Sequence, residues 1–291
     1  MSDNIIIKDG FVYGGWREPK NIWTHLKDSI HDDTTAQKVG MRGGTIPGTI
    51  HLSLFPPLLL KTFGDRWFEK GSISMYYTYA TTDRENVRAV IALPPEDIDD
   101  TQVDARVEMR DGRIVAKGTV SIGDPSEPSY LQTVDLKNSD PKELRILADF
   151  KVGYEIQPKE VLVSQEEVEK GLKAITDHLE YYKGDSPWGC GILSPTAINQ
   201  IMQFKSETLS SKEIKGVPFY GATEIQIING PVKVDVPYKV NGKIICVGVS
   251  PKTEYFWYDS ILEEKETSNQ IAKMRHMNRF MKAYSPLYQS I

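Results

Sequence analysis

Strict alternation of apolar and polar residues on either side of the dipeptide Asp111-Gly112 constrains the fold of this 291-residue chain more than any other feature. An Asp-Gly pair between two such runs is a strong signal of a two-residue hairpin turn. Alternation with a period of two is typical of strands with one buried and one solvated face. The stretch therefore predicts an antiparallel hairpin in a sheet that is covered on one side; its apolar positions are Val103, Ala105, Val107, Met109, Ile114, Ala116, Gly118, Val120 and Ile122.

The apolar run of residues 52–63 is the segment expected to cover that sheet. Proline is accommodated only in the first turn of a helix, so Pro56 and Pro57 predict either a helix that begins near Leu54 or a kink. Gly64 then provides an ordinary C-terminal cap.

A polar, glycine-rich loop precedes this run and carries His31 and Asp33. Free N–H groups at the start of a helix can hold a carbonyl oxygen or an anion. The order of loop, glycines and helix thus predicts a binding site near Gly48, with His51 beside it. His51 could contact a bound carbonyl group or simply cap the helix.

The same plan occurs again further along the chain. A stretch rich in Pro, Ser and Asp at residues 123–143 is expected to be a linker. Beyond it, Ser164 and Glu167 form a capping box at the start of a helix, and a polar loop, an apolar run and long extended segments follow. The pattern predicts two domains, residues 1–124 and 145–291, joined by a linker at 125–144.

Composition excludes several classes of function. The net charge of −5 without a cluster of Lys or Arg argues against a nucleic-acid partner. No apolar run approaches the roughly 20 residues that cross a bilayer, and the N-terminal residues do not resemble a signal peptide, so a cytoplasmic protein without a membrane partner is expected. Cys190 and Cys246 are far apart in sequence and are expected to be reduced thiols, with no metal site. No P-loop, GxGxxG, GxSxG or HExxH motif occurs.

Short motifs in both halves match one known family. In the first half, His31-Asp32-Asp33 has the form His-x-Asp, Gly40-Met41 follows, and Ile46-Pro47-Gly48 forms a turn ahead of the apolar run. In the second half, Gly184-Asp185-Ser186-Pro187 and Ile192-Leu193-Ser194-Pro195 hold the corresponding places. These motifs resemble, in degraded form, the Gly-Asp-x-Asn-Pro-x-His-x-Asp loop and the Ile-Ala-His-Gly turn of the MaoC-like enoyl-thioester hydratases.

This resemblance implies an α+β double hot-dog fold, in which each half wraps an antiparallel sheet around one helix. It implies a hydratase or dehydratase acting on an acyl thioester, carried by CoA or by an acyl carrier, with no cofactor. In that family an Asp and a His handle the water molecule, and a backbone N–H at the helix start polarises the thioester carbonyl. The exposed edges of such sheets make a homodimer plausible.

Neither half carries the complete Asp and His pair of the family, which leaves three readings open. Asp28 and His31 could form a shifted pair, or Asp185 from the second half could reach His31. Alternatively, the fold could serve as an acyl-binding or interaction scaffold that has lost the pair, since a fold does not fix a function. Hydrolysis of an acyl thioester is a further enzymatic alternative.

The remaining candidates follow from the same loops. Gly48, His51, Asp33 and Trp188 are predicted to contact the substrate. His276, in a basic segment near the C-terminus, is expected on a solvated strand face.

Overall fold

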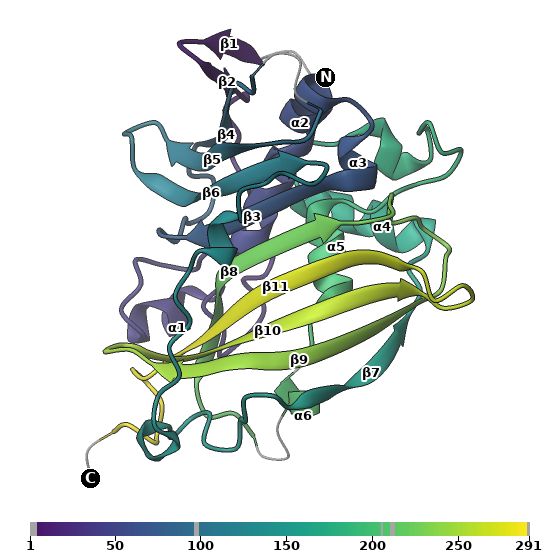
Figure 1. The fold of residues 1–291 in the computed structure, drawn as a ribbon. Helices are drawn as coiled ribbons and strands as arrows, with labels where there is room; N and C mark the ends of the chain where they lie inside the picture. The colour runs from purple at the N-terminus through teal and green to yellow at the C-terminus, as the bar shows by residue number, and fades with distance from the viewer. Residues whose placement is uncertain (1–4, 96–98, 205, 210–212, 290–291) are drawn as a thin grey trace.

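One antiparallel sheet runs through the molecule and, among the residues described, contains eleven strands (Figure 1). The fold is that of a computed structural model, which describes residues 5–95, 99–204, 206–209 and 213–289. The order of strands across the sheet is β1-β2-β4-β5-β6-β3-β8-β11-β10-β9-β7. The strands are β1 (Ile6–Lys8), β2 (Phe11–Tyr13), β3 (Gly71–Tyr77), β4 (Val87–Ala92), β5 (Thr101–Met109), β6 (Ile114–Ile122), β7 (Glu155–Val161), β8 (Val217–Ile227), β9 (Tyr238–Val249), β10 (Thr253–Glu264) and β11 (Gln270–Met281).

The two halves of the chain repeat one arrangement. In the first half β2 is followed by helices and then by β3 to β6; in the second half β7 is followed by helices and then by β8 to β11. The halves join where β3 pairs with β8, with Ser74 opposite Glu224. Because this pairing is antiparallel, the end of β3 lies beside the start of β8. The internal duplication predicted from the sequence is confirmed at the level of secondary structure.

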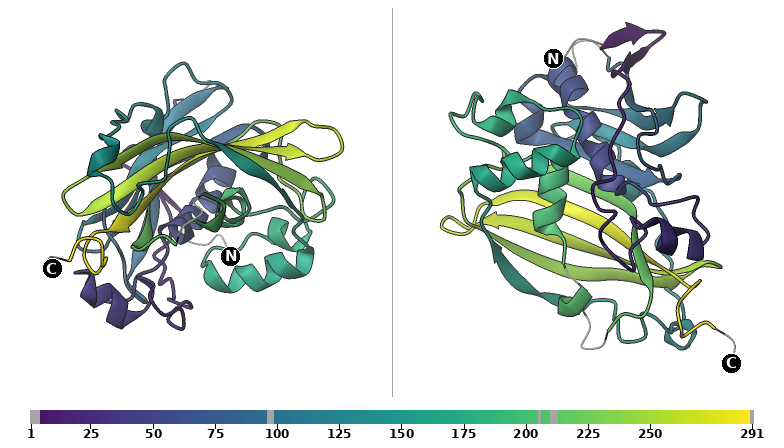
Figure 2. Two further views of the ribbon diagram at one scale, coloured as in Figure 1. Left: turned by 90° about the horizontal axis from the view of Figure 1, so that it is seen from below. Right: turned by 180° about the vertical axis from the view of Figure 1, so that it is seen from behind.

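Most of the helices, including the central helices η1, α2 and α5, gather on one face of the curved sheet (Figure 2). Ser53 of η1 and Thr196 of α5 share a buried hydrogen bond of 2.6 Å, which places the central helices of the two halves side by side. Within the described residues, no helix is long and apolar enough to cross a bilayer. The helices are α1 (Asp33–Lys38), η1 (Gly48–Leu54), α2 (Pro56–Phe63), α3 (Trp67–Lys70), η2 (Tyr130–Gln132), η3 (Pro141–Glu143), α4 (Gln165–Gly171), η4 (Leu172–Ala174), η5 (Glu180–Lys183), α5 (Pro195–Met202) and α6 (Ser206–Leu209).

The proline pair divides the first central helix, as its sequence predicts. A 3₁₀ segment, η1, ends at Leu54, and α2 begins at Pro56, where a missing N–H costs nothing. Gly64 ends α2 with a φ of 64°, a left-handed conformation that glycine adopts without strain. The capping box of Ser164 and Glu167 is likewise present at the start of α4.

The predicted hairpin is confirmed as β5 and β6, with two corrections. The connection is a three-residue loop rather than a two-residue turn: Met109 N–H donates to the carbonyl of Arg113, and Gly112 takes the left-handed position. In addition, β6 is buried on both faces for most of its length, not on one.

The cover on the second face is the segment expected to be a linker, residues 125–144. Leu131 in η2 is fully buried, and its N–H donates to the hydroxyl of Ser74 at 3.0 Å. Glu224 on β8 accepts hydrogen bonds from Ser74 at 2.7 Å and from the hydroxyl of Ser129. The segment therefore crosses the outer face of the sheet at the junction of the halves and is held there by a buried carboxylate.

Candidate functional site

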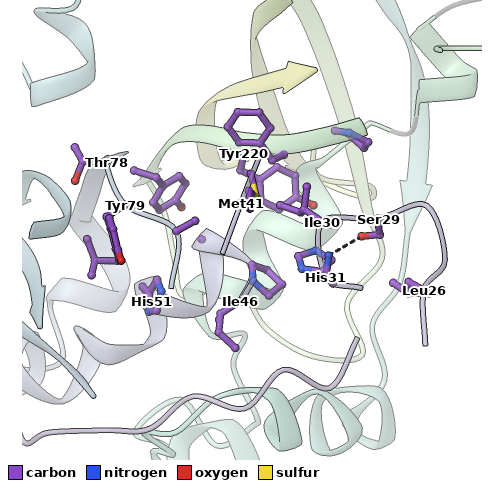
Figure 3. Close-up of a pocket in the computed structure, with 17 residues that line it drawn as sticks. Leu26, Ser29, Ile30, His31, Met41, Ile46, His51, Thr78, Tyr79 and Tyr220 are labelled. Carbon is purple, nitrogen blue, oxygen red and sulfur yellow. Dashed lines mark hydrogen bonds between the residues drawn. The ribbon is translucent and has the colours of Figure 1, made fainter. Parts of the chain in front are cut away.

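A cavity of about 440 Å³ opens at one end of the β3–β8 pair (Figure 3). Its walls come from the turn at residues 46–48, from residues 77–80 at the end of β3, from residues 218–220 at the start of β8, and from the loop that carries His31. The first half supplies most of the lining, and the second half supplies one wall. The cavity has the mostly apolar walls and few polar groups of a small-molecule site.

His31 is the polar side chain of this cavity with the best-defined chemistry. Its ring packs against Trp23 at 5.9 Å between centroids, and its Nδ1 lies 2.7 Å from the carbonyl oxygen of Thr45. A carbonyl only accepts hydrogen bonds, so Nδ1 carries the hydrogen and Nε2 keeps a lone pair. Burial lowers the pKa of His31 below its usual 6.5, opposed by the bond to Thr45. A neutral imidazole with a free lone pair is suited to act as a base at neutral pH.

The two acidic residues that follow His31 stabilise the loop. Asp32 caps α1 by accepting from the N–H of Thr35 at 2.9 Å and from its hydroxyl at 2.8 Å. Asp33 accepts from the N–H of Gly44 at 2.7 Å and so closes the glycine-rich loop on itself. Both carboxylates are therefore engaged in holding the backbone around His31.

Asp28 is not brought to His31 by this loop. It is exposed, has a left-handed φ of 59°, and is not among the residues that line the cavity. Within the described part of the chain, no carboxylate is hydrogen-bonded to His31. The shifted pair of Asp28 and His31 stays a prediction without a contact to support it.

Asp185 and Trp188 belong to a different part of the molecule. Trp188 donates its indole N–H to Glu69 at 2.8 Å and packs edge-on against Phe68 and Tyr181. Asp185 is exposed on the same loop. Neither residue lines the cavity at His31.

The repeated fold places a second, equivalent position at the opposite end of the β3–β8 pair. Residues 193–195 at the start of α5 hold there the place that residues 46–48 hold at the open cavity, and Ile73 and Ile227 flank them. Trp67 and Phe68 fill this position, so that only about 10 Å³ remains. One of the two related sites is thus open and the other is closed by aromatic side chains.

Gly48 and His51 both lie at the open cavity. A Cβ atom on Gly48 would lie 3.0 Å from the ring of Tyr77, so any larger residue would require this ring to shift. His51 is buried, and its Nε2 lies 2.9 Å from the hydroxyl of Thr81. Burial lowers the pKa of His51 to about 4 and keeps the ring neutral.

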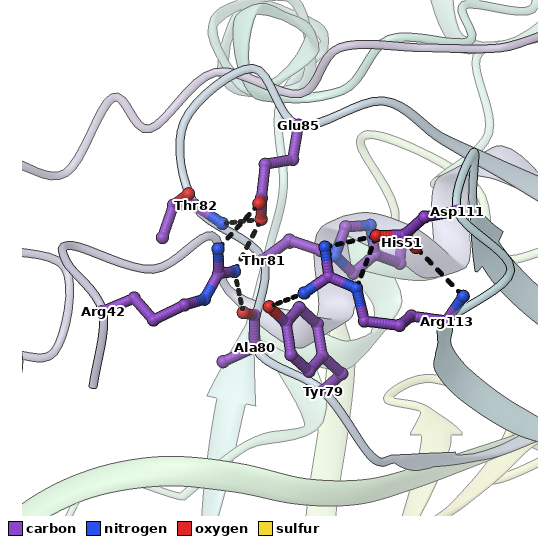
Figure 4. A network of polar contacts seen from close by, with 9 residues as sticks. All are labelled: Arg42, His51, Tyr79, Ala80, Thr81, Thr82, Glu85, Asp111 and Arg113. Atoms are coloured by element: carbon purple, nitrogen blue, oxygen red, sulfur yellow. Dashed lines mark hydrogen bonds and ion pairs between the residues drawn. The ribbon is translucent and has the colours of Figure 1, made fainter. Parts of the chain in front are cut away.

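Two arginines hold Tyr79 at the cavity wall (Figure 4). Its ring lies between the guanidinium groups of Arg42 and Arg113, at 4.8 and 4.6 Å from the ring centroid. Each arginine is also paired with a carboxylate, Arg42 with Glu85 at 2.8 Å and Arg113 with Asp111 at 2.5 Å. The positive charge beside the cavity is therefore matched by negative charge.

Sequence reasoning missed the aromatic wall made by Tyr77, Tyr79, Phe219 and Tyr220. The only signal in the sequence was the cluster of tyrosines at residues 76–79, which is equally typical of a buried strand. Phe219 and Tyr220 lie far from His31 in the sequence, and only the β3–β8 pairing brings them to it.

No protein-family profile and no curated protein sequence matches the chain. Solved structures do resemble it. A putative MaoC domain dehydratase from Chloroflexus aurantiacus matches with a TM-score of 0.58 at 11% identity, over 92% of this chain and 93% of its own. A conserved hypothetical protein of Mycobacterium tuberculosis, described as having a double hot-dog fold, matches at 0.54 and 10% identity over 88% of each chain. The dehydratase domain of the CurJ module of curacin polyketide synthase matches at 0.50 and 12% identity over 96% of each.

These likenesses define the fold. The chain is an α+β protein whose structural neighbours are double hot-dog proteins and MaoC-like dehydratases over most of its length. The fold class predicted from the sequence is confirmed. At identities near 11%, the likeness extends to the fold and not to the chemistry of the site.

Proposed function

We propose that the open cavity is the active site of a MaoC-like hydratase or dehydratase acting on an acyl thioester, with His31 as its base. The observation that carries the proposal is the bond from His31 Nδ1 to the carbonyl of Thr45, which leaves Nε2 unprotonated at the cavity. The fold shared with MaoC-like dehydratases supports it. The acyl thioester, on CoA or an acyl carrier, is proposed on the same grounds.

A single imidazole suffices for a balanced reaction. In dehydration, Nε2 of His31 removes the proton from Cα of a 3-hydroxyacyl thioester, and the electron pair moves onto the thioester oxygen. The imidazolium then returns this proton to the hydroxyl group on Cβ as the C–O bond breaks, which releases water and the enoyl thioester. Hydration is the reverse. Gly48, at the cavity, would offer its peptide N–H to the developing negative charge.

Hydration of crotonyl-CoA, followed by the loss of enoyl absorbance, tests the proposal. His31→Gln removes the base and should slow hydration by about 10²- to 10⁴-fold, the usual contribution of general acid–base catalysis. His25→Gln changes an exposed histidine and serves as the matched control. Equal rates for wild type and His31→Gln would rule out His31 as the base, and release of free thiol would instead indicate thioester hydrolysis.

A second candidate function is a binding scaffold without hydration chemistry. It is favoured by one observation: among the described residues, none that lines the cavity is an Asp or a Glu. A protein that binds apolar acyl groups but neither hydrates crotonyl-CoA nor releases thiol would support this alternative.

A further inference from the structure

A buried chain of hydrogen bonds leads from Tyr77, on the cavity wall, into the core of the second half. The phenol of Tyr77 donates to the hydroxyl oxygen of Thr223 at 3.1 Å. That hydroxyl lies 2.9 Å from Nδ1 of His276. Thr223 and His276 are both completely buried, so the prediction of a solvated His276 is wrong. The residue faces inward because β11 turns this side toward α5 and not toward water.

A second chain reaches the same histidine from Tyr220. The phenol of Tyr220 donates to Oε1 of Gln203 at 3.0 Å, and the amide of Gln203 donates to Oδ1 of Asn199. Asn199 Nδ2 then lies 3.4 Å from Nδ1 of His276. The ring of Tyr220 also packs edge-on against His276 at 4.9 Å between centroids. Two tyrosines on the cavity wall are thus tied to one buried imidazole.

Donor and acceptor roles in this buried network, formed by Thr223, His276, Asn199 and Gln203, follow from the amide groups. Asn199 uses its oxygen to accept from Gln203, so its NH₂ group faces His276 and can only donate. Nδ1 of His276 is therefore an acceptor, and the hydroxyl of Thr223 donates to it. In both series of hydrogen bonds, each donor therefore lies on the side of the cavity and each acceptor on the side of His276.

The complete burial of His276 agrees with its role as a neutral acceptor. It lowers the pKa of His276 to about 3 and keeps the ring neutral. A proton on Nδ1 would also face the NH₂ group of Asn199. Because Nδ1 of His276 accepts at the end of both series of hydrogen bonds, each tyrosine hydroxyl keeps one partner. This partner is Thr223 for Tyr77 and Gln203 for Tyr220.

We propose that this buried network is a positioning device, through which the second half holds the rings of Tyr77 and Tyr220 as the wall against which a neutral, apolar ligand packs. The cavity favours such a ligand, because no described lining residue is Lys, Arg, Asp or Glu. With its hydroxyl tied inward, each tyrosine presents its ring rather than a mobile polar group to the ligand. The proposal concerns binding, and it holds whether or not His31 performs acid–base chemistry.

Thr223 allows a test that separates hydrogen bonding from packing. Thr223→Val keeps the shape and loses the hydroxyl, whereas Thr223→Ser keeps the hydroxyl and loses a methyl group. Binding of the neutral fluorescent probe N-phenyl-1-naphthylamine is the readout, so the result does not depend on any enzymatic activity. Ser260→Ala is the matched control, because Ser260 is a buried hydroxyl in the second half without a hydrogen-bond partner in the described structure.

Thr223→Val should weaken probe binding about tenfold, which corresponds to roughly one buried hydrogen bond. Thr223→Ser and Ser260→Ala should bind within about twofold of wild type, since the network stays intact. Tyr220→Phe keeps the ring but loses its anchor on Gln203 and should also bind more weakly; it provides the test if Thr223→Val does not fold. Ala80→Trp, at an exposed position on the cavity, should block binding and so locates the probe.

If Thr223→Val bound the probe as tightly as wild type and Thr223→Ser bound it more weakly, the proposal would be overturned, since packing alone would then account for the role of Thr223. Unchanged binding by Tyr220→Phe, or a wild-type protein that does not bind the probe, would also overturn the proposal. Loss of crotonyl-CoA hydration in His31→Gln with unchanged probe binding would separate the catalytic role from the positioning role.

Discussion

At the scale of single residues, the environment of each histidine decides what its ring can do. His31 is partly buried with one nitrogen fixed, whereas His51 and His276 are enclosed. All three have a pKa lowered by burial. Among these three, only His31 both lines the cavity and has a tautomer fixed so that Nε2 keeps a lone pair, and therefore only it is assigned the role of base.

The lowered pKa of His31 predicts the pH dependence of hydration. The base must be neutral, and its pKa lies below 6.5. The rate should therefore be flat above about pH 6.5 and fall only at more acidic pH, where the imidazole takes up a proton. A pH profile of kcat/KM for crotonyl-CoA measures this; a fall that begins well above pH 7 would contradict the assignment of His31 as the base.

His51 and His276 predict a loss of stability in mild acid. Their folded-state pKa values, about 4 and about 3, lie below the value of 6.5 in the unfolded chain. The unfolded state therefore takes up protons first as the pH falls. Stability should be complete above pH 6.5 and decrease by on the order of 2 kcal/mol per histidine at pH 5.

Urea unfolding at pH 7.5 and pH 5 checks this prediction. In His51→Gln the difference between the two pH values should shrink by on the order of 2 kcal/mol. Replacement of the exposed His25 by Gln should leave the difference unchanged. An identical pH dependence in wild type and His51→Gln would show that His51 is not enclosed as described.

At the scale of elements, the segment 125–144 differs most from its sequence pattern. Its Pro, Ser and Asp residues are typical of a linker, yet Ser129 and Leu131 fasten it to the sheet through Glu224 and Ser74. The polar composition reflects these bonds as well as exposure to solvent.

Leu131→Ala tests whether this segment is part of the folded core. Leu131 is fully buried, so its truncation should destabilise the protein by about 2–5 kcal/mol. Thr133→Ala, at an exposed position two residues further on, should change stability by less than about 0.5 kcal/mol. Chemical denaturation gives both values, and equal stabilities for the two variants would mean that the segment is not packed on the sheet.

At the scale of the whole molecule, the continuous sheet couples the two halves. The strands β3 and β8 pair across the junction, and one hydrophobic core extends through both halves. This coupling lets the second half provide one wall of the cavity that His31 of the first half also lines. Of the two positions related by the repeat, one is open, and the aromatic side chains of Trp67 and Phe68 close the other.

Unfolding should therefore occur in one cooperative transition. Trp67 reports on the first half and Trp257 on the second, and both are buried. Within each variant that retains only one of these tryptophans, the urea midpoint from tryptophan fluorescence should equal the midpoint from far-UV circular dichroism, which reports on both halves. A fluorescence midpoint that differs from the circular-dichroism midpoint of the same variant would indicate that the halves unfold independently and that residues 1–124 and 145–291 behave as separate domains.

The sequence by itself determined the elements that depend on neighbouring residues. The period-two alternation of residues 103–122, the proline pair at 56 and 57, and the capping box of Ser164 act within one strand, one helix turn or one cap. The repetition of loop, helix and strands, together with the resemblance of the short motifs to those of MaoC-like hydratases, predicted the double hot-dog fold.

Only the tertiary structure decided which surfaces meet. Alternation shows which residues share a face of a strand but not what covers that face, so the second cover on β6 and the burial of His276 could not be predicted. For the same reason, the sequence placed His31 in a loop but could not place Tyr220 in the same cavity. That placement depends on pairing between strands that are more than 100 residues apart in the chain.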